Sequence, residues 1–284
     1  MSKHNKVKDD QAENGHRQLS SAEIGIPVEM TAQSIADGKA QAEAQAERLK
    51  EHEVQTLARV EATPRLITID DLRKDPIVKA FIRRSNEQLK LIGYTEHGER
   101  HASLVANIAH NILERLGRPA RQADLAAMAG YLHDIGNVVH RENHAQTSAL
   151  IAFDVLQRLG MDPYETALVM GAIGNHEEER GDPVSEIAAA IIIADKADVH
   201  ISRVQNPDPS AYDIHDRVNA AATKSFVHVS EDAKRIAIDL TINTQSATIM
   251  EYFEIFLSRM VMARKAAQFL DTSFELVING TRLY

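Results

Sequence analysis

One adjacent histidine–aspartate pair has the residue types and the setting that metal binding requires. His133 and Asp134 end the apolar stretch DLAAMAGYLHDIG, whose Leu125 and Leu132 share a helix face that places the pair against the core. Gly136 then breaks the helix. A buried carboxylate beside a buried imidazole costs free energy unless its charge is compensated, and a divalent cation compensates it efficiently. The pair therefore predicts a metal site.

Side chains of the same two types recur on the apolar faces of other predicted helices. His101, for example, shares a face with Val105 and Ile112, at offsets of 4 and 11 residues. The other side chains placed in this way are His144, His176 and Asp195. A single histidine on an apolar face is usually a core residue with its hydrogen bonds satisfied. Six ligand-type side chains directed into one core instead favour a shared metal site.

The chemistry of such a site is limited to nitrogen and oxygen ligands. The chain has no cysteine, which excludes disulfides and thiolate ligands. Imidazole and carboxylate ligands with open coordination positions suit Fe, Mn, Co, Ni or Zn. A metal ion held in this way can activate a bound water as the nucleophile. Such a site needs no protein nucleophile, and the sequence contains no Gly-x-Ser-x-Gly motif.

The order of these residues resembles the HD-domain superfamily of metal-dependent phosphohydrolases. The matching stretches are HASLVANIA, GYLHDIGN, NHAQTSALIAFDVL, AIGNHEE and ADKADV, within residues 97–199. The resemblance implies an all-α catalytic core and one metal ion held by His101, His133, Asp134 and Asp195. Asp134 would bridge to a second ion, whose ligand set His144 and His176 complete. We expect two divalent first-row transition metals, with Fe or Mn preferred and Zn, Co, Ni or Mg as alternatives.

Within that superfamily, the chain differs from two branches. Cyclic-di-GMP phosphodiesterases carry a second histidine after the fourth ligand, where this chain has Glu177 in NHEEERGDPV. Alarmone hydrolases carry an acidic pair after their His-Asp, where this chain has Ile-Gly-Asn. The ligand order is most similar to that of binuclear dinucleoside-polyphosphate hydrolases. The sequence as a whole is most similar to a bacterial group of unassigned HD-domain proteins.

The function implied by the resemblance is hydrolysis of a phosphomonoester or phosphoanhydride in a nucleotide or related small molecule, through a metal-activated hydroxide. The alternative is a regulatory HD protein, non-catalytic or weakly catalytic, whose core binds metal and a nucleotide. The complete ligand set favours the enzyme, because a binding module has no need of every ligand. Hydrolysis of RNA is disfavoured by the acidic balance and the absence of aromatic-basic clusters.

The substrate phosphate would be bound by basic residues close to the ligands in the sequence. Lys196 is the first candidate because it follows Asp195 directly. The other candidates are Arg100, Arg141 and Arg203. Each of these basic residues could instead be a solvated surface charge.

Further residues near the ligands are expected to assist them. The residues assigned catalytic roles are Asp134, Lys196 and His97. His97 lies four residues before His101 and shares its face, although an exposed histidine at a helix start is the alternative. Asp198 is expected to orient a ligand. A second pair, His215-Asp216, is expected on a surface helix or a lid segment, away from the metals.

The elements that position these residues are predicted to be helices separated by clear breakers. Helices are expected after Asp70-Asp71, from Pro76 to Gly93, and at 97–116, 121–134, 144–159, 163–176 and 184–204. Glycines close several of them, at Gly93, Gly117 and Gly160. The stretch EIAAAIIIADKADV is apolar nearly all round, which predicts a helix buried among the others.

The pattern changes beyond Pro209. Alternating strands are expected at 226–230 and 235–243, then a helix at 246–270, and a hairpin around Asn279-Gly280. The predicted fold class is mostly α, an HD-type helical bundle core with a small C-terminal α+β appendage. The predicted domains are a polar N-terminal arm at 1–65, partly helical or disordered, a catalytic domain at 66–224, and the appendage at 225–284 with the order β-β-α-β-β.

Composition and charge limit the partners. The 284 residues carry a formal net charge of -9, which argues against non-specific binding of nucleic acid or an anionic membrane. The N-terminus has no apolar signal segment, and the longest apolar run, 187–194, is too short to span a bilayer. We expect a cytoplasmic protein with a phosphorylated small-molecule substrate and with no nucleic-acid or membrane partner. The wide apolar surface of helix 246–270 predicts a homodimer contact, or else packing on its own sheet and the core.

Overall fold

The computed structural model describes residues 40, 41, 43–45, 47, 48 and 65–284. The residues described before 49 are helical and exposed. The remainder of the N-terminal arm predicted for 1–65, apart from Arg65, lies outside the described residues. The chain divides into two units, Met1–Ala62 and Thr63–Tyr284, and the second contains every predicted site residue.

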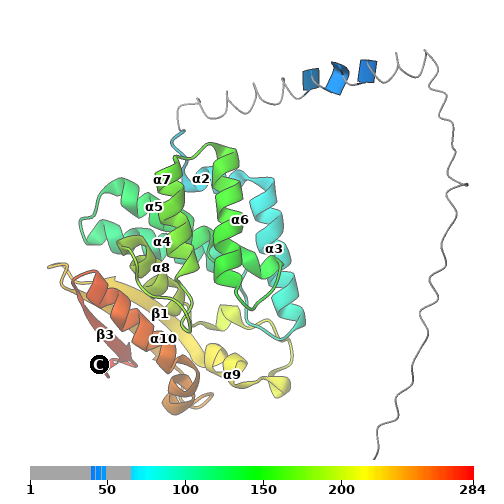
Figure 1. The fold of residues 1–284 in the computed structure, drawn as a ribbon. Coiled ribbons are helices and arrows are strands. Elements are labelled where there is room, and N and C mark those ends of the chain that lie inside the picture. The colour runs from blue at the N-terminus through cyan, green and yellow to red at the C-terminus, as the bar shows by residue number, and fades with distance from the viewer. Residues whose placement is uncertain (1–39, 42, 46, 49–64) are drawn as a thin grey trace, which may run out of the picture. The chain divides into compact units, whose positions relative to one another are not determined.

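The second unit begins as a bundle of helices and ends as a small sheet crossed by one long helix (Figure 1). Its helices, with short 3-10 turns named η, are α2 Ile69–Lys74, α3 Pro76–Leu91, α4 Glu99–Arg115, α5 Ala120–Leu132, η1 Ile135–Val138, α6 His144–Leu159, α7 Pro163–Gly174, α8 Glu186–Lys196, η2 Ile201–Arg203, η3 Pro209–Ala211, α9 Ile214–Ala221 and α10 Ile249–Phe269. The strands are β1 Ala222–Val229, β2 Arg235–Ile242, β3 Ser273–Ile278 and β4 Thr281–Arg282. This architecture is the predicted one.

Helix α8 lies at the centre of the core, as its uniformly apolar sequence predicted. Every residue from Ile187 to Lys196 is buried, and α8 packs against α4, α5, α7 and α10. The predicted extent of 184–204 was wrong, because the helix ends at Lys196. Tight backbone bonds then turn the chain, from the Asp198 amide to the Asp195 carbonyl and from the Val199 amide to the Ala197 carbonyl. This turn lets the Asp198 side chain reach back into the core.

Small residues allow α4 and α5 to approach closely. A Cβ atom added at Gly130 would lie 3.0 Å from the Cα atom of Ala106, closer than such contacts normally are. The facing positions of α4 are also alanines, Ala102 and Ala109, and both are buried. This close packing brings the start of one helix next to the end of the other, which places His101 and His133 side by side.

The helix ends follow the predicted signals. Asp75 accepts hydrogen bonds from the amides of Ile77 and Val78 at the start of α3, with Pro76 in the first turn. The predicted closing residues all adopt the left-handed conformation that favours glycine; they are Gly93, Gly117 and Gly160. The aspartates at 70 and 71 were predicted to precede α2 but lie in its first turn, because Thr68 is the N-cap residue.

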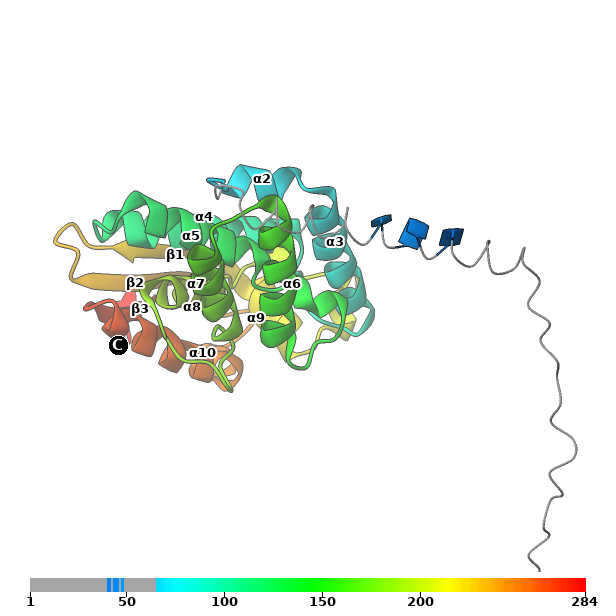
Figure 2. The ribbon, with the colours of Figure 1, turned by 45° about the horizontal axis from the view of Figure 1, so that its top comes forward.

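The sheet has the order β1-β2-β3-β4, and its elements follow the predicted sequence β-β-α-β-β. Strands β1 and β2 are antiparallel, whereas β3 is parallel to β2 because α10 crosses over between them. One face of the sheet is buried, with Ile236, Ile238 and Leu240 pointing into it. Helix α10 contacts both β3 and α8, so the appendage is joined to the helical core (Figure 2).

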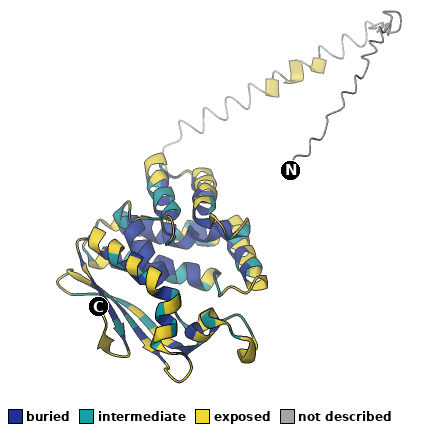
Figure 3. Ribbon diagram, turned by 60° about the horizontal axis from the view of Figure 1, so that its bottom comes forward, coloured by how far each residue is buried: buried dark blue, intermediate teal, exposed yellow. Residues whose placement is uncertain are grey.

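Burial follows this arrangement, since the buried residues gather where the helices face one another (Figure 3). On α10, Phe256 and Met260 are buried, while Met250, Leu257 and Val261 are exposed by 75%, 55% and 39%. Part of the predicted apolar surface therefore stays exposed in a single chain.

Within the described part of the chain, no helix has both the length and the apolar character needed to cross a bilayer.

Candidate metal centre

The structure brings the six predicted ligand residues together in the core. Two groups of three have side-chain ligand atoms that all lie within 4.8 Å of one another. One group is His101, His133 and Asp195, and the other is His133, Asp134 and His176. His144 lies against the second group and is buried like the others.

Four side chains surround the first position. The Nε2 atom of His101 lies 3.2 Å from Nε2 of His133 and 3.4 Å from Oδ1 of Asp195. Asp134 completes this set, with Oδ2 at 3.5 Å from His101 Nε2 and 3.4 Å from His133 Nε2. Two nitrogens and two carboxylate oxygens thus converge on a common point.

The second position uses the other oxygen of Asp134. Its Oδ1 atom lies 3.2 Å from Nε2 of His144 and 3.9 Å from Nε2 of His176. The two histidine nitrogens are 3.2 Å apart. Asp134 therefore offers one carboxylate oxygen to each position, as a ligand that bridges two ions does.

The orientation of the four histidines is that of metal ligands. Each ring uses Nδ1 for a protein acceptor: His101 for Asp198 at 2.6 Å, His133 for the Gly130 carbonyl, His144 for the Arg141 carbonyl and His176 for the Ile173 carbonyl. A ring that donates through Nδ1 keeps the Nε2 lone pair free. Pairs of Nε2 lone pairs that face one another at 3.2 Å repel unless a cation or proton lies between them. This donor set fits a pair of divalent metals.

The ends of helices position these ligands. His101 lies in the first turn of α4, Asp195 in the last turn of α8, and His144 begins α6 after Asn143 in the left-handed conformation. His133 and Asp134 follow α5, where the chain passes into η1. Gly136 is required there, because an added Cβ atom would lie 2.4 Å from the His144 carbonyl oxygen.

Nearby charges and hydrogen bonds keep the two aspartates ionised despite their burial. Burial by itself raises the pKa of Asp134, but the charge of His133 and a hydrogen bond from His101 outweigh it and hold that pKa well below the usual range. The pKa of Asp195 is lowered in the same way, with Lys196 opposing the effect of burial. The centre thus holds two negative charges at neutral pH, which attract cations.

The same surroundings shift the pKa values of His101 and His176 in opposite directions. Burial and the charge of Arg203 lower the pKa of His101, but hydrogen bonds to three aspartates raise it to about 10. Burial, with the charges of His133 and His144, lowers the pKa of His176 to about 3. A cation entering the centre must therefore displace a proton at His101 but not at His176.

Asp198 orients His101, as predicted, and two arginines hold Asp198. The guanidinium of Arg100 contacts both carboxylate oxygens at 3.2 and 2.7 Å. Arg203 is buried and donates to the backbone carbonyls of Asp198 and Glu96. Both arginines were predicted to bind substrate. In this structure they hold Asp198, which orients the candidate ligand His101, and they do not line the cavity described next.

A narrow cavity of about 10 Å³ opens beside the candidate ligands. It is lined by His97, Asp134, Arg141, His144, His176, Glu177, Glu178, Asp195, Lys196 and Arg259. Three predicted residues that are not ligands are among them: His97, Arg141 and Lys196. Glu178 and Arg259 were not predicted. The signal for Arg259 was a lone arginine within the apolar segment EIFLSRMVM of the C-terminal helix.

The predicted catalytic groups at this cavity already have protein partners. The Lys196 ammonium donates hydrogen bonds to Asp195 Oδ2 at 2.6 Å and to the His176 carbonyl at 3.0 Å. It also lies 3.1 Å from Glu178 Oε1 in an ion pair. His97 bonds the Thr95 carbonyl through Nδ1, and its Nε2 accepts from Arg203 at 2.9 Å. Burial and the charge of Arg203 lower the pKa of His97, so its ring is neutral.

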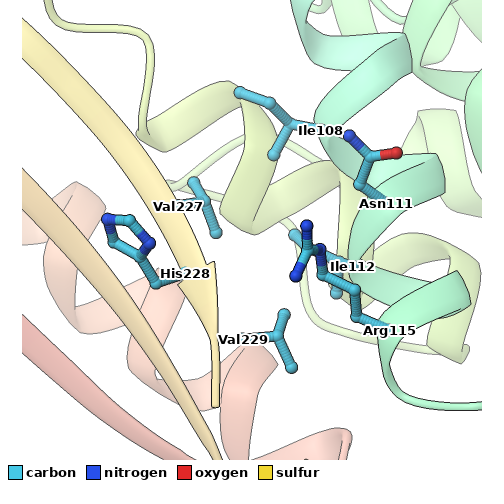
Figure 4. A pocket seen from close by; sticks show the side chains of 7 residues that line it. All are labelled: Ile108, Asn111, Ile112, Arg115, Val227, His228 and Val229. Atoms are coloured by element: carbon cyan, nitrogen blue, oxygen red, sulfur yellow. The ribbon is translucent and has the colours of Figure 1, made fainter. Parts of the chain in front are cut away.

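Two other features lie outside this cavity. His215 is exposed on α9 and Asp216 is buried beside it, and neither lines the cavity. A larger hollow of about 160 Å³ separates α4 from β1 (Figure 4). Its lining is apolar apart from Asn111, Arg115 and His228, and it shares no residue with the metal centre.

Comparison with known proteins matches the same region. Residues 98–200 match the family described as the HD domain, and this span includes all six candidate ligand residues. The chain is also 30% identical over 220 residues to an uncharacterized protein of Methanocaldococcus jannaschii. That similarity covers 69% of this chain and 84% of the relative.

Proposed function

The chain belongs to the HD-domain superfamily, and we propose that it is a metal-dependent phosphohydrolase acting on a nucleotide or related small phosphorylated molecule. The observation that carries this proposal is the position of Asp134, with one carboxylate oxygen toward each of two clusters of histidine nitrogens. In a hydrolase that uses two ions, such a bridge would hold the ions close to one another.

In this proposal the first ion is held by His101, His133, Asp134 and Asp195, and the second by Asp134, His144 and His176. Imidazole and carboxylate ligands suit Fe or Mn first, with Zn, Co, Ni or Mg as alternatives. When bound, the ions would supply Lewis acidity toward the phosphate and lower the pKa of water.

The protein's own residues hold this centre rigid and set its charge. Asp198 fixes the ring of His101, and Lys196 fixes the second oxygen of Asp195. The cavity is lined by four carboxylates and three basic side chains. Without metal ions, this charge balance disfavours the binding of an anion. Two divalent cations would reverse that balance, which links substrate binding to metal binding.

The alternative is a regulatory protein that binds metal and nucleotide without turnover. A complete ligand set with every histidine oriented through Nδ1 supports the enzyme, because an inactive binding module does not need both positions. The two proposals differ in whether phosphate is released.

A phosphate-release screen tests the proposal. Purified protein would be supplied with Mn²⁺ or Fe²⁺ and assayed against nucleotides, their polyphosphates and other small phosphate esters. We expect release by the wild type, none by Asp134→Ala, and normal release by His215→Ala, which changes a histidine outside the cavity. Metal binding without release from any substrate would favour the regulatory alternative.

A further inference from the structure

One basic side chain at the cavity comes from the C-terminal α+β unit and not from the HD region. Arg259 lies in the middle of α10, beyond residues 98–200 that match the HD domain. Its guanidinium stacks over the ring of Phe256, with 5.2 Å between its central carbon and the ring centroid. Its side chain is 21% exposed and lines the cavity beside the candidate ligands.

The protein contact of Arg259 is ionic and exchangeable. Its Nε atom lies 2.9 Å from Oε1 of Glu178, and Lys196 Nζ lies 3.1 Å from the same oxygen. That buried oxygen nevertheless has no hydrogen-bond partner, because neither donor is aligned with it. Glu178 also keeps Lys196 as a counter-charge if Arg259 moves to another anion. An exchange of partners therefore leaves no buried carboxylate unpaired.

The other basic groups near the centre are committed elsewhere. Lys196 donates hydrogen bonds to the His176 carbonyl and to Asp195, and it forms an ion pair with Glu178. Arg100 and Arg203 are bound behind Asp198. Arg141 donates to Asn137 Oδ1 at 3.4 Å and stacks over Tyr94. Arg259 thus offers the cavity a planar guanidinium, the group that binds two phosphate oxygens at once.

The charge of Arg259 also acts on the metal centre. Burial lowers its pKa, but Glu178, Asp195 and Asp134 outweigh burial and raise it, so the side chain is always charged. Arg259 lines the same cavity as Asp134 and Asp195, two of the proposed ligands. A phosphate bound there would meet Arg259 on one side and the ions on the other.

We propose that Arg259 binds the phosphate group of the substrate, exchanging Glu178 for the phosphate oxygens, so that α10 of the C-terminal unit is part of the substrate site. This inference rests on the proposed function for the identity of the substrate. Its test uses inorganic phosphate and does not depend on turnover. The lining suits a charged phosphate group, because every residue that lines the cavity is ionisable and none is apolar.

Calorimetry with inorganic phosphate on the Mn²⁺-loaded full chain tests the inference. Arg259→Met should weaken phosphate binding by roughly tenfold to a hundredfold, the value of a hydrogen bond between charged groups. Arg264→Met is the matched control and should bind as the wild type does. Arg264 lies on the same helix, is half-buried, and stacks over Tyr284 at 5.3 Å. Phosphate affinity unchanged in Arg259→Met would overturn the inference, as would a wild type that binds no phosphate.

A second variant separates phosphate binding from a structural role. Glu178→Gln removes the competing carboxylate, so phosphate should bind as tightly as in the wild type or more tightly. If Arg259 served only to hold Glu178, both variants would lose affinity equally, and that result would refute the inference. Elemental analysis should find equal metal content in the wild type and both variants. Phosphate binding that depends on Arg259, without turnover of any substrate, would sink the proposed function alone.

Discussion

Removal of the Asp134 carboxylate is expected to empty both metal positions. Asp134 lies 3.5 Å from His101 through Oδ2 and 3.2 Å from His144 through Oδ1. Without it, the first cluster falls from four ligand side chains to three and the second from three to two. Loss of a hydrogen bond to a ligand already costs ~10–100-fold in metal affinity, so loss of a ligand costs at least ~100-fold. Turnover should fall by at least ~1000-fold.

The assay is elemental analysis after metal reconstitution and gel filtration, alongside phosphate release. The wild type should hold close to two first-row metals per chain and Asp134→Ala fewer than one. Asp134→Asn keeps one oxygen and replaces the other by an amide, so it should hold about one. Metal-stripped Asp134→Ala should still unfold in one cooperative thermal transition, because alanine leaves no buried carboxylate unpaired. Near-normal activity in Asp134→Ala, or one metal or fewer in the reconstituted wild type, would refute the bridged arrangement.

Two further predictions concern stability and assembly. Burial raises the pKa of Asp75, but hydrogen bonds from the Val78 amide and Arg158 outweigh burial and lower that pKa. The ionised carboxylate therefore stabilises the fold at pH values above the pKa of Asp75 in the unfolded chain. This stabilisation is lost as the pH falls through the lower pKa of the folded protein. In urea unfolding, Asp75→Ala should lower the free energy of unfolding by about 1–2 kcal/mol at pH 7 and by less at pH 3. An equal decrease at both pH values would contradict the role of the charge. The exposed Met250, Leu257 and Val261 of α10 favour a homodimer contact, so light scattering should find about twice the 31.5 kDa chain mass. A strictly monomeric mass at micromolar concentration would remove that prediction.

The sequence by itself determined the helical fold and which residues cluster at its centre. Apolar periodicity predicts which face of a helix is buried, so a histidine such as His101 on that face must point into the core. Glycines at 93, 117 and 160 mark helix ends through a backbone conformation that other residues seldom adopt. The buried α8 was predictable because a helix that is apolar all round has no face suited to water. These signals are local, and a linear pattern records them.

Only the tertiary structure decided what the polar groups around the ligands do. Arg100 and Arg203 stand near ligands in the sequence, yet Asp198 binds them from behind because α8 ends at Lys196 and turns the chain back. Arg259 lies 64 residues beyond Asp195 in the sequence and still reaches the cavity, because α10 crosses over the sheet and packs against α8. A side chain's charge is visible in a sequence, but its partner is set by which elements meet, and that depends on long-range packing.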